Sequence, residues 1–258
     1  MKSIKQIQKE YKLLTENEKS SWLEELKNDN RKGVQQYLSK LQKERVQESK
    51  WRKQYALMTA YENQLFAEDI KYIAGIDEVG RGALAGPVVS GCVILPKDCY
   101  IPRLNDSKKV SPKLRDELYD EIMEKAIAVS IGVVEASEID EINILQGTKK
   151  SMIQAVQKLK VIPEHLLIDA LELDIAIPQY GIIEGDSCSV SIAAASIIAK
   201  VTRDRMMIKL HEVYPDYGFN QHVGYGTKQH IQAIEEYGIC IQHRKTFSPI
   251  KEMVRDFY

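Results

Sequence analysis

The pattern of hydrophobic and polar positions changes near residue 70. Residues 1–70 contain one glycine and no proline, are rich in Lys, Glu, Gln and Leu, and space their apolar residues as helices do. Thr15 with Glu18 fits a capping box, and Asp29 or Asn30 is placed to cap a following helix. No a/d repeat persists long enough to require a coiled coil. The pattern predicts two or three helices with narrow apolar faces, forming an accessory segment over residues 1–70.

From Lys71 the apolar runs become short and β-branched, as in strands. They predict five strands, at residues 72–77, 87–96, 126–136, 165–171 and 180–186. Helical spacing predicts four helices, at residues 137–160, 187–215, 227–238 and 248–258. The first three strands have connections that suit hairpins, whereas the fourth follows a helix. Residues 71–258 are therefore expected to form an α/β domain, a mixed sheet with helices on its faces and a helical C-terminal part.

Composition narrows the class of protein. With 258 residues, 44% hydrophobic and 28% charged, the chain fits one large globular domain, or one domain with an appendage. No apolar run approaches the roughly 20 residues that span a bilayer, and the N-terminus lacks the apolar centre of a secretory signal. The four cysteines show no C-x-x-C pair and no histidine at zinc-ligand spacing. We expect a cytoplasmic protein with reduced thiols and no membrane association.

The net charge of −1 hides an asymmetry between the two parts. Residues 1–70 carry 14 Lys and Arg against 11 Asp and Glu, a net of +3, and the remainder carries 22 against 26, a net of −4. A mildly basic arm on a mildly acidic body suits a nucleic-acid partner. A solvated helical surface would give the same small imbalance.

Four acids fall at the predicted strand ends. Asp77 and Glu78 close the first strand, Asp169 follows the apolar run of the fourth, and Asp186 ends the fifth. Each alone is an ordinary turn or cap residue, but they converge if their strands are neighbours that end on the same side. Clustered carboxylates cannot all stay ionised at neutral pH without cations, and oxygen-only ligands suit Mg²⁺ or Mn²⁺. Two such ions about 3.5–4 Å apart are a common arrangement for phosphodiester hydrolysis.

Six motifs in series resemble the ribonuclease HII family, the bacterial type 2 ribonucleases H. They are GIDEVGRGALAGPVV (75–89), NDSKKVS (105–111), LLIDAL (166–171), EGDSCSVSIAAASIIAKVTRD (184–204), GYGT (224–227) and HRKTFSP (243–249). The resemblance covers roughly residues 71–250. It implies a ribonuclease H-like fold and places the family's metal-binding, catalytic acids at Asp77, Glu78, Asp169 and Asp186.

The resemblance also implies a set of substrate-binding residues. Gly80, Arg81, Gly82 and Tyr225 match the residues that read the junction between a ribonucleotide and the deoxyribonucleotide 3′ to it. Glycines let the backbone approach a ribose closely, so that a 2′-hydroxyl can be sensed by hydrogen bonds. Without the family, the glycines would be taken for a tight turn and the tyrosine for a half-buried core residue.

Several basic residues are candidate phosphate contacts. Lys108 resembles a family contact, and Lys109, Lys200 and Arg203 are weaker candidates. His222 and His243 are not assigned a role, because a two-metal mechanism requires no general-base histidine.

Two positions depart from the family pattern. Ala170 stands where family members often have glycine, and Val223 stands where they often have lysine before the GYGT glycine. The second departure is expected to weaken substrate binding, not the chemistry.

The resemblance implies a monomeric endoribonuclease dependent on Mg²⁺ or Mn²⁺, with two ions during catalysis. It would cut the RNA strand of RNA–DNA hybrids, and cut 5′ to single ribonucleotides in duplex DNA, leaving 3′-hydroxyl and 5′-phosphate ends. Two alternatives stay open: a ribonuclease HIII type that spares single ribonucleotides, and a non-catalytic hybrid-binding protein. Nucleotide binding at the glycine-rich turn is excluded, since no G-x-x-x-x-G-K-[ST] or helix-opening G-x-G-x-x-G occurs.

Overall fold

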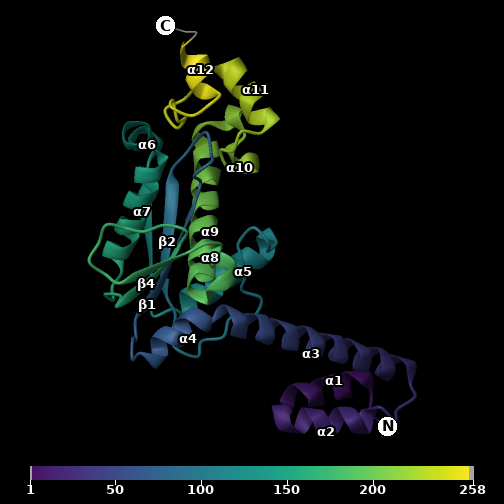
Figure 1. Ribbon diagram of the computed structural model, residues 1–258. Helices are drawn as coiled ribbons and strands as arrows, with labels where there is room; N and C mark the ends of the chain where they lie inside the picture. The colour runs from purple at the N-terminus through teal and green to yellow at the C-terminus, as the bar shows by residue number, and fades with distance from the viewer. Residues whose placement is uncertain (1, 256–258) are drawn as a thin grey trace. The chain divides into compact units, whose positions relative to one another are not determined.

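The chain forms two compact units, residues 1–54 and 55–258, joined within one long helix (Figure 1). The computed structural model describes residues 2–255. No helix among these residues is both long enough and apolar enough to cross a membrane.

The first unit is helical. It contains α1 (Ile4–Leu13), α2 (Glu16–Leu26) and most of α3 (Lys32–Met58), packed around a small core of Ile7, Leu23, Val34, Leu38 and Leu41. The predicted capping box is confirmed, because the Glu18 carboxylate accepts the backbone N–H of Thr15 at 2.8 Å. The Asp29 carboxylate instead binds Arg31, through its backbone N–H and guanidinium, just before α3 begins.

The second unit is built on a five-stranded mixed sheet, as predicted. Its strand order is β3-β2-β1-β4-β5, with β1 antiparallel to β2 and parallel to β4. β2 and β3 are antiparallel, and β4 and β5 are parallel. The strands are β1 (Ile73–Val79), β2 (Val88–Ile94), β3 (Ala128–Val134), β4 (His165–Asp169) and β5 (Gln179–Ile182).

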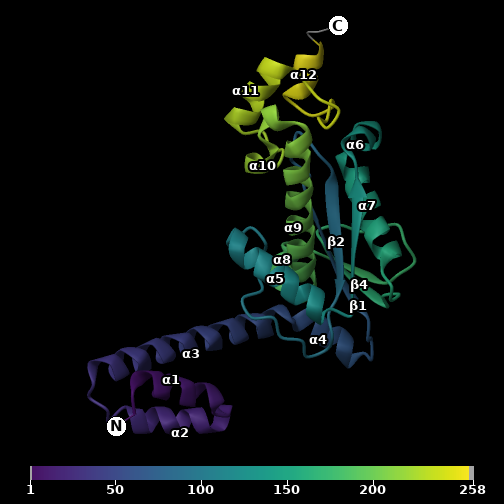
Figure 2. The same ribbon diagram turned by 180° about the vertical axis from the view of Figure 1, so that it is seen from behind.

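Helices cover both faces of the sheet (Figures 1 and 2). On one face lies α9 (Val190–Val213), with α5 (Pro112–Lys125) beside it, and on the other lies α7 (Ile144–Lys158). The helix α9 approaches β1 closely because Gly75 has no side chain, since a Cβ there would lie 2.0 Å from the carbonyl carbon of Ser191. A buried apolar layer on each face therefore encloses the central strands.

The end of the N-terminal region belongs to this second unit. The Tyr55 hydroxyl near the end of α3 donates to the Cys99 carbonyl oxygen at 2.7 Å. The next helix, α4 (Ala60–Ala67), buries Leu65 against Ile73 and Leu167 of the sheet. Residues 1–70 thus contain four helices rather than two or three, and the last of them packs on the sheet.

Several predicted elements need correction. The connection between β2 and β3 is not a hairpin, because it contains α5, which begins at Pro112 and is capped by the Ser111 hydroxyl. The helix expected over 137–160 is two helices, α6 (Ala136–Ile142) and α7, separated by Asn143 at φ +66°. The fifth strand ends at Ile182, and a short helix α8 (Gly185–Cys188) precedes α9.

The C-terminal part packs beyond the end of α9. It comprises the 3₁₀ helix η1 (Pro215–Tyr217), α10 (Phe219–His222), α11 (Lys228–Tyr237) and α12 (Ile250–Arg255). These helices surround an apolar cluster that includes Leu84, Met207, Tyr217, Phe219 and Ile234. The expected helices at 227–238 and 248–258 are present, although the end of the second lies outside the described residues.

Candidate active site

The carboxyl ends of β1 and β4 bring three acids together. These strands are parallel neighbours with Ile76 opposite Ile168, so Asp77 and Asp169 follow in adjacent positions. Carboxylate oxygens of Asp77, Glu78 and Asp169 all lie within 4.8 Å of one another. β1 continues to Val79, so the two acids of this strand lie just before its end and not beyond it.

The chain itself compensates the charge of this cluster only in part. Asp77 is 5% exposed, and burial, followed by the charges of Glu78 and Asp169, raises its pKa well above the ordinary value. Burial also raises the pKa of Glu78, although Arg81 opposes this shift across an ion pair of 3.2 Å. Glu78 Oε2 is buried and has no hydrogen-bond partner among the described residues. Clustered, buried oxygen donors of this kind fit a hard divalent cation.

Asp186 lies next to this cluster but outside the group of three. It sits in α8, which starts after Glu184 turns the backbone into the left-handed region at φ +54°. The backbone N–H of Gly185 donates to Asp169 Oδ1 at 2.8 Å, which ties the start of α8 to the end of β4. Burial raises the pKa of Asp186 to about 6, with further contributions from Asp106 and Asp169.

Asp106 is a further buried acid beside the site that sequence reasoning did not select. It is 8% exposed, and its Oδ1 accepts the backbone N–H of Lys108 at 2.8 Å. The neighbouring Ser107 hydroxyl bonds with Ser196 of α9 at 2.8 Å, which places this loop against the site. Asp106 lies in the quoted NDSKKVS motif, but only the packing of this loop on α9 reveals its nearness to Asp186.

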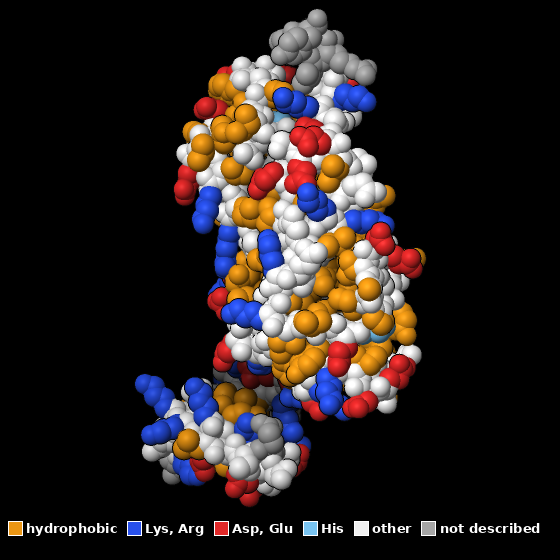
Figure 3. Space-filling model, turned by 90° about the vertical axis from the view of Figure 1, so that its left-hand side faces the viewer, with side chains coloured by type: hydrophobic (Ala, Val, Ile, Leu, Met, Phe, Trp, Pro, Cys, Tyr) orange, Lys and Arg blue, Asp and Glu red, His pale blue; other side chains and the backbone are white. Residues whose placement is uncertain are grey.

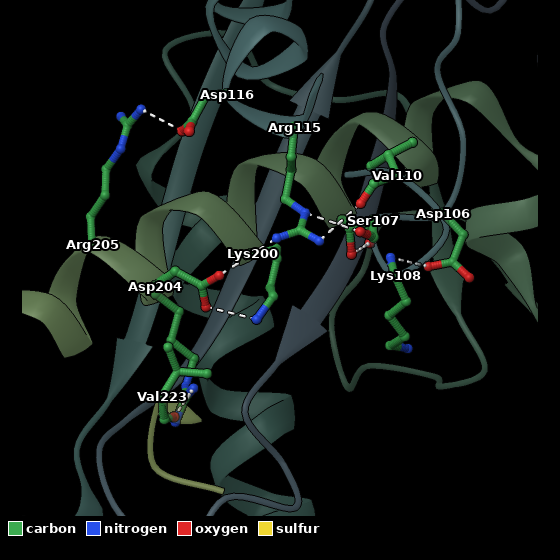
Figure 4. Close-up of polar contacts among 12 residues, drawn as sticks. Asp106, Ser107, Lys108, Val110, Arg115, Asp116, Lys200, Asp204, Arg205 and Val223 are labelled. Atoms are coloured by element: carbon green, nitrogen blue, oxygen red, sulfur yellow. Dashed lines mark hydrogen bonds and ion pairs between the residues drawn. The ribbon is translucent and has the colours of Figure 1, made fainter. Parts of the chain in front are cut away.

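Lys108 lies near the acids, and its ammonium group forms no ion pair with any of the described ones. In Figure 4 its backbone, but not its ammonium group, is joined to Asp106 by a dashed line. Burial lowers the pKa of Lys108, but Asp77 and then Asp106 raise it by more, so the net shift is upward. Because no ion pair fixes the ammonium group of Lys108, it can donate a hydrogen bond to a phosphate oxygen of the substrate.

The side chains of the other basic candidates already bond with other residues of the protein. Lys109 donates to the Ser187 hydroxyl at 2.8 Å, and Lys200 pairs with Asp204 at 2.7 Å (Figure 4). Arg203 is fully buried.

The guanidinium of Arg203 donates to three carbonyl oxygens, those of Ala85, Pro87 and Val223. The prediction that Arg203 contacts phosphate is therefore wrong, because this side chain ties three backbone segments together.

The two glycines of the Gly80–Arg81–Gly82 loop differ in the space around them. Gly80 has φ +93°, and a Cβ there would lie 2.2 Å from Arg203 Nε, so the fold itself requires glycine. A Cβ on Gly82 would meet nothing within 4 Å. The carbonyl of Arg81 accepts from Arg244 at 3.0 Å, which fixes the loop between these glycines. The open space at Gly82 is not explained by packing within the chain.

Tyr225 is half-buried, and buried histidines hold its loop. Its ring lies 5.6 Å from the Arg203 guanidinium carbon, and its carbonyl oxygen bonds with His230 Nδ1 at 3.0 Å. His230 Nε2 in turn lies 3.1 Å from His243 Nε2. Burial lowers the pKa of both histidines to about 4, so this chain of hydrogen bonds is uncharged at neutral pH.

His222 is likewise buried and bonded to the Tyr217 carbonyl oxygen and the Gly224 N–H. The histidines of this region therefore support the GYGT loop through hydrogen bonds with the backbone and with each other.

Comparison with known proteins decides the family. The family model described as Ribonuclease HII matches residues 74–250, and one described as Ribonuclease HII N-terminal domain matches residues 3–66. The chain belongs to the ribonuclease HII family. A ribonuclease HII from Bacillus cytotoxicus is 57% identical over 228 residues, covering 88% of each chain. Another, from Bacillus cereus strain B4264, is 56% identical over 239 residues, covering 93% of each chain.

A solved structure shares the fold of most of the chain. The ribonuclease H2 from Pyrococcus horikoshii OT3 matches with a TM-score of 0.60 and 26% identity, covering 72% of this chain and 98% of that chain. The expected ribonuclease H-like fold is therefore confirmed.

Both departures from the ribonuclease HII pattern fall on strained backbone. Ala170, where family members often have glycine, has φ +50°, and Val223 has φ +44°. Side chains other than glycine pay a steric penalty in this region, and β-branched ones are rare there. The Val223 carbonyl oxygen accepts from Arg203 at 2.8 Å, which helps hold this conformation.

We expect Asp77→Asn to stabilise the metal-free protein. Because the pKa of Asp77 is raised in the folded state, ionising this side chain costs stability once the pH rises above about 4, the ordinary pKa of an aspartate, and the gain from the substitution should grow with pH. At pH 8 the melting temperature should rise by about 2–4 °C, the shift that about 1 kcal/mol produces in a domain of this size. Thermal denaturation in EDTA measures it.

The matched control is Asp174→Asn, which removes an exposed acid and should leave the melting temperature unchanged. A fall in the melting temperature of Asp77→Asn at pH 8 would contradict the repulsion described above.

Proposed function

We propose that this ribonuclease HII hydrolyses the RNA strand of RNA–DNA hybrids and cuts 5′ to single ribonucleotides embedded in duplex DNA. The products would carry 3′-hydroxyl and 5′-phosphate ends, and the role would be removal of ribonucleotides from DNA. The observation that carries the proposal is the group of three carboxylates at the ends of β1 and β4, with its unpaired buried Glu78 oxygen.

The proposed metal ligands and catalytic residues are Asp77, Glu78, Asp169 and Asp186. Two Mg²⁺ or Mn²⁺ ions, when bound, supply a nucleophilic water and compensate charge at the leaving oxygen. The acids hold the ions, and Lys108 supplies a positive charge beside them for the phosphate. Gly185 keeps the Asp169 carboxylate oriented through its N–H.

The proposed reader of the ribonucleotide is the loop of Gly80, Arg81 and Gly82 together with Tyr225. Gly82 supports this proposal, because no described residue fills the space that its side chain would take. A backbone left open there can approach a ribose and test its 2′-hydroxyl. The half-buried Tyr225 ring offers an apolar face to the next sugar, where an extra hydroxyl would fit poorly.

We further propose that residues 1–70 are an accessory segment that holds the duplex flanking the cut. The compact unit of residues 1–54 carries 14 Lys and Arg against 8 Asp and Glu, a net charge of +6. Basic side chains are prominent on this unit, the lower part of Figure 3.

A groove of about 630 Å³ lies between α1 and α3 of this unit. Lys5, Lys9 and Lys12 line it from one face of α1, and Tyr11 and Tyr37 also line it. These three lysines have no ion pair among the described residues, and basic side chains beside aromatic rings suit a nucleic-acid backbone.

We propose that the enzyme acts as a monomer in the cytoplasm.

The substrate proposal is tested on a DNA duplex with one ribonucleotide, a long RNA–DNA hybrid and an all-DNA duplex. With Mg²⁺ we expect cleavage of the first two, with the single-ribonucleotide duplex cut on the 5′ side of the ribonucleotide. Asp77→Asn should lower the rate by about 10²-fold or more, the loss expected when several kcal/mol of metal stabilisation is removed. Mapping the product ends measures both site and chemistry.

Each contrary result has a separate meaning. Cleavage that persisted in EDTA would contradict the metal mechanism, and an undiminished rate for Asp77→Asn would contradict the site. Activity on the long hybrid alone would favour the ribonuclease HIII type, and binding without cleavage would favour the non-catalytic alternative.

The groove is tested by replacing Lys5, Lys9 and Lys12 with glutamine. Because each phosphate contact contributes about 0.9 to the salt dependence of binding, the slope of log K against log[salt] should fall by about 2–3. Binding to a duplex in EDTA at several salt concentrations measures this. The control changes Lys32, Lys50 and Lys53, which do not line the groove, by the same total charge. Equal effects of the two triple variants would overturn the assignment of the groove.

A further inference from the structure

Glu62 is a buried carboxylate that the proposed chemistry does not use. It lies in α4 and is 3% exposed. Its Oε1 accepts the Ser189 hydroxyl at 2.5 Å and the backbone N–H of Ser191 at 3.0 Å. Its Oε2 is buried with no hydrogen-bond partner among the described residues. A carboxylate in such surroundings is costly, and burial raises its pKa.

The partners of Glu62 lie at the junction between α8 and α9. Ser189 is the N-cap of α9, and its hydroxyl oxygen accepts the backbone N–H of Ile192 at 3.2 Å. The backbone N–H of Ser189 donates to the Gly185 carbonyl oxygen at 2.8 Å, which closes the single turn of α8. Asp186 is the residue after Gly185, so the turn that carries this acid ends at the residue that Glu62 holds.

The junction is fixed from a second side by β1. The backbone of Ser191 lies directly over Gly75, where any side chain would collide with it. Gly75 is two residues before Asp77 on the same strand and therefore on the same face. Glu62 and Gly75 together hold the first turn of α9 against the strand that provides Asp77.

We infer that Glu62 is a positioning residue for the metal site, acting through Ser189 and Ser191 to set the place of Asp186 relative to Asp77 and Asp169. The inference rests on the proposed function, since it assumes that these acids bind the ions. Without the Glu62 acceptor, the buried N–H of Ser191 would lose its partner and the α8–α9 junction would shift to find another. Residues outside the ligand set commonly tune metal affinity in this way.

The inference also gives the N-terminal region a part in the chemistry. Glu62 precedes residue 71, where the motifs resembling the catalytic domain begin, and lies within residues 3–66, which match the N-terminal domain of the family. It is nevertheless part of the compact unit of residues 55–258. The last helix of the N-terminal region would thus complete the catalytic unit.

The test measures Mn²⁺ binding to the full chain by electron paramagnetic resonance of the free ion. It also measures the Mg²⁺ concentration that half-activates cleavage. Glu62→Ala should weaken Mn²⁺ binding about 10-fold or more and raise the half-activating Mg²⁺ concentration similarly, as loss of an outer partner of the ligands does. The rate at saturating Mg²⁺ should change much less. Glu62→Gln keeps an acceptor oxygen and should restore affinity to within about twofold of the unchanged protein.

A second variant guards against loss of folding. Glu62→Met fills similar volume and removes the unpaired buried charge, so it should fold while still lacking the acceptor. It should bind Mn²⁺ as weakly as Glu62→Ala does.

The matched control is Glu164→Ala, which removes a carboxylate that accepts the backbone N–H groups of Lys71 and Tyr72. This contact lies at the opposite end of β1, so Mn²⁺ affinity should not change.

Normal Mn²⁺ affinity in a folded Glu62→Met or Glu62→Ala protein would overturn the inference while leaving the proposed function intact. The same holds if Glu62→Gln binds as weakly as Glu62→Ala. If the unchanged protein binds no Mn²⁺, or Asp77→Asn binds it equally well, the proposed metal site fails and this inference fails with it.

Discussion

Mutual repulsion among three clustered carboxylates is the constraint on which the rest of this site depends. Asp77, Glu78 and Asp169 place their oxygens within 4.8 Å of one another, with Asp77 buried and the other two half-buried. Only Arg81 forms an ion pair with them among the described residues, and it reaches Glu78 at 3.2 Å. Three ionised carboxylates at this distance destabilise the fold unless cations bind to them. The rest of the fold must therefore hold the acids together despite their mutual repulsion.

The sheet provides that restraint. β1 is central, flanked by antiparallel β2 and parallel β4, and apolar layers enclose it from both faces. The parallel pairing sets Asp77 beside Asp169, and the contact of Gly75 with Ser191 seats α9 against the same strand. Stability lost at the acids is offset by this core, a common division of roles between a scaffold and its functional site. Glu62 extends the same arrangement to the turn that carries Asp186.

The cluster of acids could be predicted from the sequence, because the end of a strand and the acid that follows it are both visible in a short stretch of residues. Acids after apolar runs had to meet if β1 and β4 were parallel neighbours, which they are. The helix α5 was missed although Ser111 and Pro112 mark its start, because two apolar runs around it looked like a hairpin. Arg203 was only a candidate for a phosphate contact, because the sequence shows its charge but not its three carbonyl partners, which are set by tertiary packing.

The contacts of Asp106 and Glu62 were beyond sequence reasoning for the same reason. Asp106 approaches Asp186 from 80 residues away in the chain, and Glu62 reaches Ser189 from a helix that looked like part of an accessory segment. The sequence shows that Ala170 and Val223 differ from the family pattern, but only the structure shows that both residues have a positive φ angle.

The most direct measurement of the central claim is the number of protons released when Mn²⁺ binds. It is obtained by calorimetry near pH 6 in buffers of different ionisation enthalpy. Because the pKa of Asp77 is raised and that of Asp186 lies at about 6, the metal-free site should hold protons that the ions displace. We predict release of about one proton or more per protein, falling in Asp77→Asn. A binding enthalpy independent of the buffer would show that no proton leaves, and would contradict a site whose carboxylates repel one another until cations bind.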